Sequence, residues 1–357
     1  MRSQLDSIRS TRARRRVFAF AVFATSTLLL VGCASTPASD GDSDGSGADA
    51  PSGSSDAFPV TIESALGDAV IEAEPQRIVT IGWASADTAI ALGTTPVGVE
   101  SAIWGGNADQ QFPWVTDAVE AAGDDLPEVF NVYPEVDIEA ILALEPDLVL
   151  APQSGITAED FATLSEIAPT VAYPGAPWAT AWNDQIDIIG KALGKSEQAT
   201  ELISDIETQL ANAAAANPEF ADLSYAYVYA AVPGELAFYQ AGDARVDVIS
   251  GLGLTLDETV AATPVTEGTF TAVVGLEQAD LLDNVDVLFT WFNDEANATE
   301  IENQPLFAQI PAVERGSYLP NVDNQLAMAS GLVTPLSVPW ALDKYVPMIK
   351  EAAGLVE

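Results

Sequence analysis

The sequence predicts an α/β protein with two Rossmann-like lobes and mostly parallel sheets, joined by one long rigid interlobe helix. Three observations lead to this prediction. From Phe58 onward, short β-rich runs alternate with helical stretches. Residues 182–217 then show helical spacing without strand signals, and a second alternating block follows. The lobes are therefore expected at residues 58–181 and 218–357, with the helical region 182–217 between them.

The first block contains four β-rich runs separated by helical ones. Asp137 stands directly before a helical run, where its side chain can cap the first turn. The alternation favours a parallel sheet, because parallel strands need crossover connections. Strands are expected at 77–81, 96–99, 147–151 and 170–172, and helices at 85–92, 138–144 and 161–167.

Two helical runs make up the middle region. The first covers residues 182–193. The second, 196–216, carries a stripe of apolar residues, which is typical of a helix with one packed face. Ser196 is expected to cap this helix, and the pair Asn217 and Pro218 to end it.

The second block repeats the pattern of the first. Residues 138–150 parallel 276–289, and residues 167–171 parallel 310–313 when one gap is allowed. The repetition indicates two similar lobes with a cleft between them. Strands are expected at 225–230, 236–239, 287–289 and 317–319, and helices near 246–252, 276–282 and 335–352.

The N-terminus carries the pattern of a secretion signal. Six arginines precede an apolar run of 15 residues, 17–31, which is shorter than the ~20 residues of a membrane span. Small residues then precede Cys33, the only cysteine, as in a bacterial lipobox. We expect a signal peptide at 1–32, lipidation of Cys33, and a flexible acidic linker at 33–57, which has too few apolar residues to fold. The alternative is a signal helix with a chance cysteine.

Charge is the outlying property of the composition. Residues 1–32 contain six Arg and one Asp, so the rest of the chain has 52 acidic and 7 basic residues, a formal charge of −45. This charge excludes nucleic acid as a natural partner, because phosphate binding needs clustered Lys and Arg. The acidity serves solubility alone, or it also disfavours strongly anionic ligands. Histidine is absent, which argues against a zinc- or manganese-binding protein.

Several motifs occur in the order that one family shows. They are the segments 75–79, 91–93 with 96–99, 139–150, 190–195 with Ala199, and 330–347. Together, behind a lipobox, they resemble the periplasmic-binding family for iron siderophores and cobalamin, and the last segment looks like its actinobacterial siderophore-binding branch. The resemblance covers about residues 60–351.

The resemblance implies an extracytoplasmic solute-binding lipoprotein that is anchored to the cell membrane. It would bind a ferric siderophore in the cleft, with little lobe closure, and deliver it to the permease and ATPase subunits of an ABC importer. It would act as a monomer without catalysis, cofactor or protein-bound metal, because the siderophore itself holds the iron. Members dock through one exposed Glu on each lobe, and the matching positions are Glu139 and Glu277. Each begins an expected helix, so a local role as a helix starter is the alternative.

A preassembled chelate needs apolar walls and a few hydrogen-bond donors. Aromatic residues in loops are candidates for the walls, although each of them alone is as well explained by core packing. Trp178 and Trp182, beside the interlobe region, are expected to pack. The expected ligand-binding residues are Trp83, Trp104, Tyr133, Arg245, Trp291 and Trp340.

The basic residue among these candidates limits the ligand class. Arg245 could donate to a ligand oxygen, or it could pair with Asp243 or Asp247. Relatives that bind triscatecholates often use several cleft arginines, and this chain has too few basic residues for such a cluster. A neutral or cationic hydroxamate chelate is therefore favoured.

Other functions stay open at this point. The alternatives are a cobalamin- or haem-binding protein of the same fold and a surface lipoprotein without a transport role. An enzyme is disfavoured because the sequence shows no Ser–His–Asp set, nucleophilic cysteine, phosphate loop or metal cluster.

Overall fold

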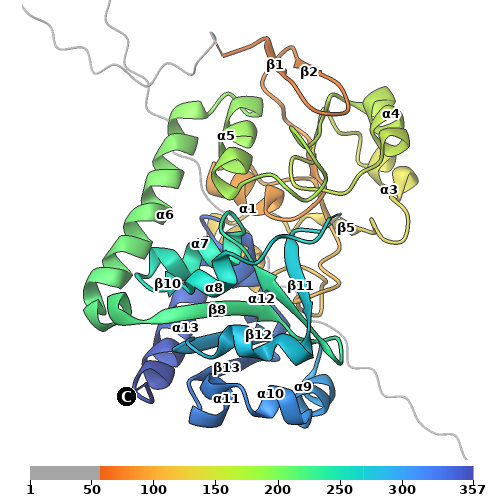
Figure 1. The fold of residues 1–357 in the computed structure, drawn as a ribbon. Coiled ribbons are helices and arrows are strands. Elements are labelled where there is room, and N and C mark those ends of the chain that lie inside the picture. The colour runs from red at the N-terminus through yellow and green to blue at the C-terminus, as the bar shows by residue number, and fades with distance from the viewer. Residues whose placement is uncertain (1–56, 268, 357) are drawn as a thin grey trace, which may run out of the picture. The chain divides into compact units, whose positions relative to one another are not determined.

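Two sheets organise residues 57–267 and 269–356, the part of the chain that this computed structural model describes (Figure 1). The expected signal peptide, Cys33 and all but the last residue of the expected linker lie outside the described residues. No helix in the described part is both long and apolar enough to cross a bilayer.

The first sheet is wholly parallel and has five strands in the order β5-β4-β3-β6-β7. The chain forms the central strand first, adds two strands on one side, and then crosses to the other side. Such a reversal opens a crevice at the carboxyl ends of the strands, here between β3 and β6. The strands are β3 Ile78–Thr80, β4 Gly98–Glu100, β5 Glu128–Phe130, β6 Leu148–Leu150 and β7 Thr170–Val171.

Helices cover both faces of this sheet because its buried strands are apolar on both sides. Ile78 and Leu148 pack toward α1 and α5, whereas Val79 and Val149 pack toward α3 and α4. Asp137 caps α3 by accepting a hydrogen bond from the backbone N–H of Ala140, as expected. The elements of this lobe, with its edge hairpin, are β1 Val60–Ile62, β2 Ala69–Ile71, α1 Ser85–Ala91, α2 Pro113–Ala122, α3 Ile138–Ala143 and α4 Ala158–Ile167.

Helix α6 (Ser196–Ala216) runs along one side of the molecule and packs against α5 (Trp182–Ala192), α7 and α13 (Figure 1). Its bounds agree with the sequence prediction, but Ser196 is the first helical residue rather than the cap. Lys195 occupies the cap position, and its Nζ donates to the carbonyl oxygen of Leu92, at the end of α1. Asn217 ends the helix, as expected.

The second sheet is mixed. Strands β13, β12, β8 and β10 pair in parallel. Strand β9 pairs antiparallel with both of its neighbours, β8 and β11. A tight turn with Gly234 at φ 82° returns the chain from β8 to β9. Strand β11 was not expected from the sequence. The strands are β8 Ser224–Tyr229, β9 Glu235–Tyr239, β10 Thr255–Leu256, β11 Thr271–Gly275, β12 Val287–Trp291 and β13 Tyr318–Asn321.

Only three helices were expected in this lobe, so η1, α8, α9, α10 and α11 were missed. Residues 276–282 form a 3-10 helix, η2, with Gln278 outside helical geometry. The expected helix 335–352 begins at Ser337, and α12 before it was missed. The elements are η1 Pro218–Asp222, α7 Ala244–Gly251, α8 Glu258–Ala261, η2 Leu276–Leu282, α9 Glu295–Glu302, α10 Pro305–Ala308, α11 Pro311–Arg315, α12 Asn324–Leu332 and α13 Ser337–Ala353.

The internal repeat is partly confirmed. The Asp147 carboxylate, before β6, accepts hydrogen bonds from the backbone N–H groups that lead into β3. Asp286, before β12, accepts from the backbone N–H and the hydroxyl of Ser224 at the start of β8. The same hydrogen-bonding pattern therefore joins the central strand pair in each lobe. The second pairing was wrong, because residues 170–171 form a strand whereas 310–313 run into helix α11.

Candidate functional site

Two adjoining pockets lie at the carboxyl ends of the strands. The larger, which we call the interlobe pocket, measures about 650 Å³ and has walls from both lobes. The smaller, which we call the N-lobe pocket, measures about 190 Å³ and is lined by the first lobe and Met328. Both pockets share Trp83, Ala84 and Trp178, so these residues stand where one pocket meets the other.

The interlobe pocket occupies the crevice where the strand order of the first sheet reverses. Trp83 follows β3 and Gln153 follows β6, so the two central strands supply one wall. The opposite wall is the loop 240–243 between β9 and α7 and the first two residues of α7, with Phe270 and the end of α12. The cleft predicted from the repeat is therefore present in the structure.

Trp83 and Trp178 form an aromatic pair between the pockets. Their ring centroids are 4.8 Å apart, and both side chains are more than one-third exposed. The backbone N–H of Trp178 donates to Ser154, and its carbonyl oxygen accepts from the side chain of Gln153. Trp178 was expected to pack, and it does pack against Trp83, but it also lines both pockets, which was not expected. Its signal in the sequence was the Pro- and Gly-rich loop 174–177, directly after a strand and thus at the carboxyl edge.

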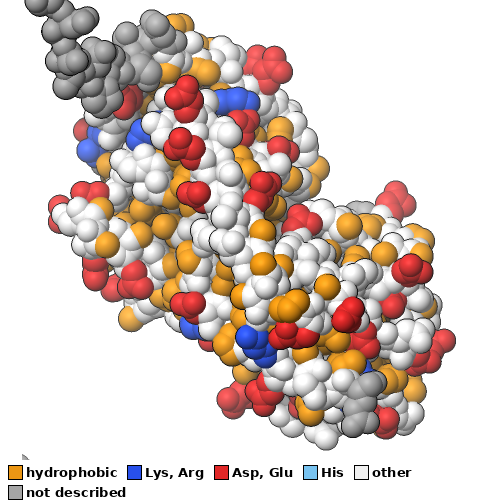
Figure 2. Space-filling view, turned by 90° about the vertical axis from the view of Figure 1, so that its left-hand side faces the viewer, with side chains coloured by type: hydrophobic (Ala, Val, Ile, Leu, Met, Phe, Trp, Pro, Cys, Tyr) orange, Lys and Arg blue, Asp and Glu red, His pale blue; other side chains and the backbone are white. Residues whose placement is uncertain are grey.

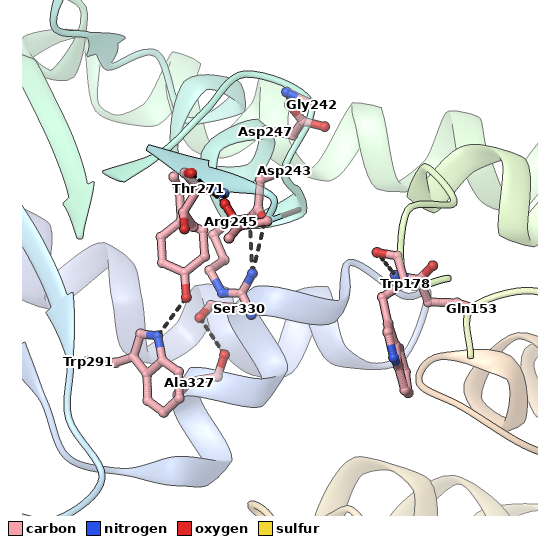
Figure 3. A network of polar contacts seen from close by, with 12 residues as sticks. Gln153, Trp178, Gly242, Asp243, Arg245, Asp247, Thr271, Trp291, Ala327 and Ser330 are labelled. Atoms are coloured by element: carbon pink, nitrogen blue, oxygen red, sulfur yellow. Dashed lines mark hydrogen bonds and ion pairs between the residues drawn. The ribbon is translucent and has the colours of Figure 1, made fainter. Parts of the chain in front are cut away.

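Arg245 lines the interlobe pocket and pairs with Asp243, so the ion-pair alternative is confirmed, whereas a hydrogen bond from Arg245 to a ligand stays a prediction. Its Nη1 lies 3.0 Å from Oδ2 of Asp243, and its guanidinium lies 4.4 Å from the ring centre of Tyr239 (Figure 3). Burial acts to lower the pKa of Arg245, but Tyr239 and Asp243 raise it above the usual value. The guanidinium therefore stays charged, and its Nε and Nη2 donate no hydrogen bond to the described residues.

Trp291 supports the pocket walls from behind. Its Nε1 donates to the hydroxyl of Tyr239 at 3.0 Å, and its ring meets the edge of Trp104 at 6.3 Å between centroids. Trp291 lines neither of the two pockets. Its role as a ligand contact stays a prediction. Its observed contacts hold Tyr239 beneath Arg245, and they hold Trp104 at the N-lobe pocket.

Trp340 lies in a cluster that packs the two lobes together. Its ring centroid is 5.2 Å from that of Trp114 in α2, and Leu332 and Ala341 belong to the same cluster. The Nζ of Lys344 lies 3.0 Å from the ring centre, a cation–π contact. Trp340 lines neither pocket, so the structure gives it a packing role, and a ligand contact by Trp340 stays an untested prediction.

The N-lobe pocket combines aromatic walls with carboxyl groups. Trp104 and Tyr133 both line it, and Tyr133 is 77% exposed. Glu100, at the end of β4, accepts a hydrogen bond from the N–H of Gly82 at 2.6 Å, and burial raises its pKa. Asp87 in α1 is buried, and desolvation raises its pKa to about 6 despite hydrogen bonds from Thr334 and Trp114.

Glu139 and Glu277 occupy the same position in the two lobes. Each is the second residue of the short helix, α3 or η2, that precedes a central strand. Both side chains are exposed, and neither touches the pockets. Both carboxylates lie in the first turn of their helix, so the local role as a helix starter stays the alternative for each of them.

Acidic side chains spread over the visible face of the protein, with few Lys or Arg between them (Figure 2). Despite this abundance, no three His, Cys, Asp or Glu residues in the described part converge to form a metal-binding group.

Comparison with known proteins places this arrangement in a family. The model of the family described as periplasmic binding protein matches residues 78–317, from the start of β3 to the residue before β13. The chain belongs to the periplasmic binding protein family. The family is one of solute-binding proteins, in agreement with the resemblance seen in the motifs.

Three proteins similar to this chain have names or titles that mention a siderophore. The crystal structure of PiaA from Streptococcus pneumoniae TIGR4, in complex with ferrichrome, matches at 30% identity and a TM-score of 0.75, over 83% of this chain and 99% of PiaA. The probable siderophore-binding lipoprotein YfiY of Bacillus subtilis is 30% identical over 156 residues, 43% of this chain and 44% of YfiY. The ferric enterobactin-binding periplasmic protein FepB of Escherichia coli is 27% identical over 72% of this chain and 82% of FepB. The chain spans about half the length of the first curated relatives it matches.

Proposed function

We propose that this protein captures a ferric siderophore in the interlobe pocket and delivers it to an ABC importer. The observation that carries the proposal is a pocket of about 650 Å³ between two lobes, with aromatic walls and one guanidinium. This volume falls within the roughly 300–1,000 Å³ of pockets that enclose a whole small ligand. The ferrichrome complex of PiaA supports the ligand class, since that protein has the same fold and 30% identity.

The pocket suits a chelate that arrives with its iron already coordinated. No metal-binding cluster occurs in the described residues, so the iron ligands would come from the siderophore. The free Nε and Nη2 of Arg245 could donate to coordinating oxygens, while Trp83 and Trp178 contact the apolar surface of the chelate. Enzymatic chemistry has no place in this proposal, and no cofactor is needed.

Charge favours a hydroxamate over a triscatecholate. Asp243 already neutralises Arg245, and among the residues that the structure describes these two are the only charged ones that line the interlobe pocket. A strongly anionic triscatecholate would find no excess of positive charge there, whereas a neutral hydroxamate would not need one. Because FepB, a ferric enterobactin-binding protein, is a relative of this chain, the binding of hydroxamates and triscatecholates has to be compared by direct measurement.

Delivery would depend on features outside the pocket. We propose that Cys33 carries the lipid anchor, that the linker 33–57 tethers the monomeric binding protein outside the membrane, and that Glu139 and Glu277 contact the permease. The two exposed carboxylates at equivalent positions of the two lobes support a docking surface with two contact points. The lipoprotein relative YfiY supports the anchor.

A titration of residues 58–357 by tryptophan fluorescence tests the ligand class. The probes are ferrichrome, ferrioxamine E, ferric enterobactin and cobalamin, and the change in melting temperature is measured alongside. Saturable quenching by a ferric hydroxamate at lower concentrations than the other probes supports the proposal. Tighter binding of cobalamin or ferric enterobactin overturns the ligand class, and no response to any probe favours a surface lipoprotein without a transport role.

A further inference from the structure

The N-lobe pocket presents hydrogen-bond acceptors without a cation to meet them. Gln111 is only 4% exposed, and its Nε2 donates to the carbonyl oxygen of Pro127 at 2.9 Å. This bond sets the orientation of the amide, so Oε1 is the free end. Within the described residues Oε1 is buried and has no hydrogen-bond partner, and Gln111 lines the pocket. A buried acceptor of this kind calls for a donor.

Carboxylates in the same pocket add negative charge. One oxygen of Glu100 accepts from Gly82, and the other forms no hydrogen bond with the described residues. Asp87 also lines the pocket, and its Oδ1 accepts from Trp114 and Thr334. Among the described residues, the lining contains neither Lys nor Arg. A positively charged donor is therefore the ligand group that these acceptors suit best.

Aromatic rings complete the walls of the pocket. Trp83, Trp104 and Trp178 are each more than one-third exposed, and Tyr133 and Phe112 line the pocket with them. Exposed aromatic faces attract cations electrostatically, and the attraction grows when the cation loses water. Rings and carboxylates together form the kind of surface that recognises an ammonium group.

We infer that the N-lobe pocket binds an alkylammonium arm of the siderophore while the chelate core lies in the interlobe pocket. This inference rests on the proposed function and names a further feature of its ligand. The volume of about 190 Å³ is too small for a whole ligand by the roughly 300 Å³ lower limit, but it accommodates a short chain. Because Trp83 and Trp178 line both pockets, the two pockets adjoin along this aromatic pair.

A matched pair of ligands tests the inference. Ferrioxamine B ends in a free ammonium group, and its N-acetyl derivative has the same chelate core without the charge. We expect the full chain to bind ferrioxamine B at least tenfold more tightly than the acetylated form, measured by calorimetry at pH 7. Glu100→Gln, which keeps an acceptor for Gly82, should remove most of this preference, because it lowers the affinity for ferrioxamine B more than the affinity for the acetylated form.

Controls keep the outcomes distinct. Glu128→Gln alters an exposed carboxylate of β5 outside both pockets and should keep the preference. If Glu100→Gln does not fold, Tyr133→Leu removes an exposed ring and should selectively weaken ferrioxamine B. Equal binding of both ligands, or an equal loss for both in the variants, overturns the inference while ferrichrome binding still upholds the proposed function. Failure of every ferric chelate to bind overturns both.

Discussion

The hydroxyl of Thr334 donates to Oδ1 of Asp87 at 2.7 Å, a hydrogen bond that joins the second lobe to helix α1 of the first. The same oxygen accepts from Nε1 of Trp114 at 2.7 Å. Trp114 in turn packs against Trp340 of the second lobe. A buried carboxyl group thus lies at the centre of a polar and aromatic contact between the lobes, directly beside the N-lobe pocket.

Asp87 should make stability depend on pH. Its pKa is about 6 in the folded protein, against 3.8 for the unfolded chain, because burial disfavours the charged form. The folded state therefore binds the proton more tightly, and the stabilisation is complete below about pH 4 and lost as pH rises through about 6. A shift of about two pK units corresponds to roughly 3 kcal/mol.

Asp87→Asn isolates this contribution. Because Asn does not titrate, the stability of the variant relative to the natural protein should increase by roughly 3 kcal/mol between pH 4 and pH 7. Urea unfolding at several pH values measures the difference, and other carboxylates cancel in the comparison. Parallel stability curves for the two proteins would show that Asp87 has an ordinary pKa.

Arg245→Gln should weaken binding of a ferric hydroxamate by tenfold or more, since a hydrogen bond to a charged group contributes about 1.5–3 kcal/mol. Loss of the guanidinium also leaves Asp243 unpaired in the pocket. The double variant Arg245→Gln with Asp243→Asn separates these effects, because it removes both charges. Calorimetric titration of both variants provides the measurement. Unchanged affinity in both would mean that Arg245 serves only as the partner of Asp243.

Trp178→Ala should reduce both ligand affinity and the quenching of tryptophan fluorescence. The residue lines both pockets and packs against Trp83, so its loss removes a wall worth about 1–3 kcal/mol of binding. Trp340→Phe is the matched comparison, because Trp340 packs between the lobes and lines neither pocket. It should lower the melting temperature with little change in affinity. The reverse pattern would restore Trp340 as a ligand contact.

Glu139→Arg and Glu277→Arg should abolish most siderophore uptake without changing ligand affinity. Each reversal places a positive charge where the proposed permease contact needs a negative one. Glu159→Arg in α4 and Glu295→Arg in α9 are matched controls, since both are exposed first-turn residues of the same two lobes. Uptake of labelled iron by cells that carry the importer is the measurement. Equal losses in the controls would indicate a general charge effect instead of docking.

Local patterns explain what could be predicted. The long apolar stripe and the Asn217 and Pro218 pair defined α6 to the residue, and Asp137 was recognised as a cap. Strands β3, β6, β8 and β12 were expected within two residues of their observed ends. These features depend on residues close together in the sequence, where spacing and capping chemistry act directly.

Contacts between side chains far apart in the sequence explain what could not be predicted. Trp178 and Trp340 both follow Pro-rich segments, yet one lines the pockets and the other packs between lobes. The side chain of Gln111 donates through Nε2 to the carbonyl oxygen of Pro127, which leaves Oε1 without a hydrogen-bond partner in the described residues. Nothing in the sequence indicated this, because the contact joins residues that only the fold brings together.

The sequence by itself determined two similar α/β lobes and the helix between them, because strand–helix alternation and helical spacing are local properties of the chain. Only the tertiary structure decided which rings and carboxyl groups face the pockets. The reason is geometric, since the ends of strands and helices far apart in sequence must first be brought together before their side chains can share a cavity.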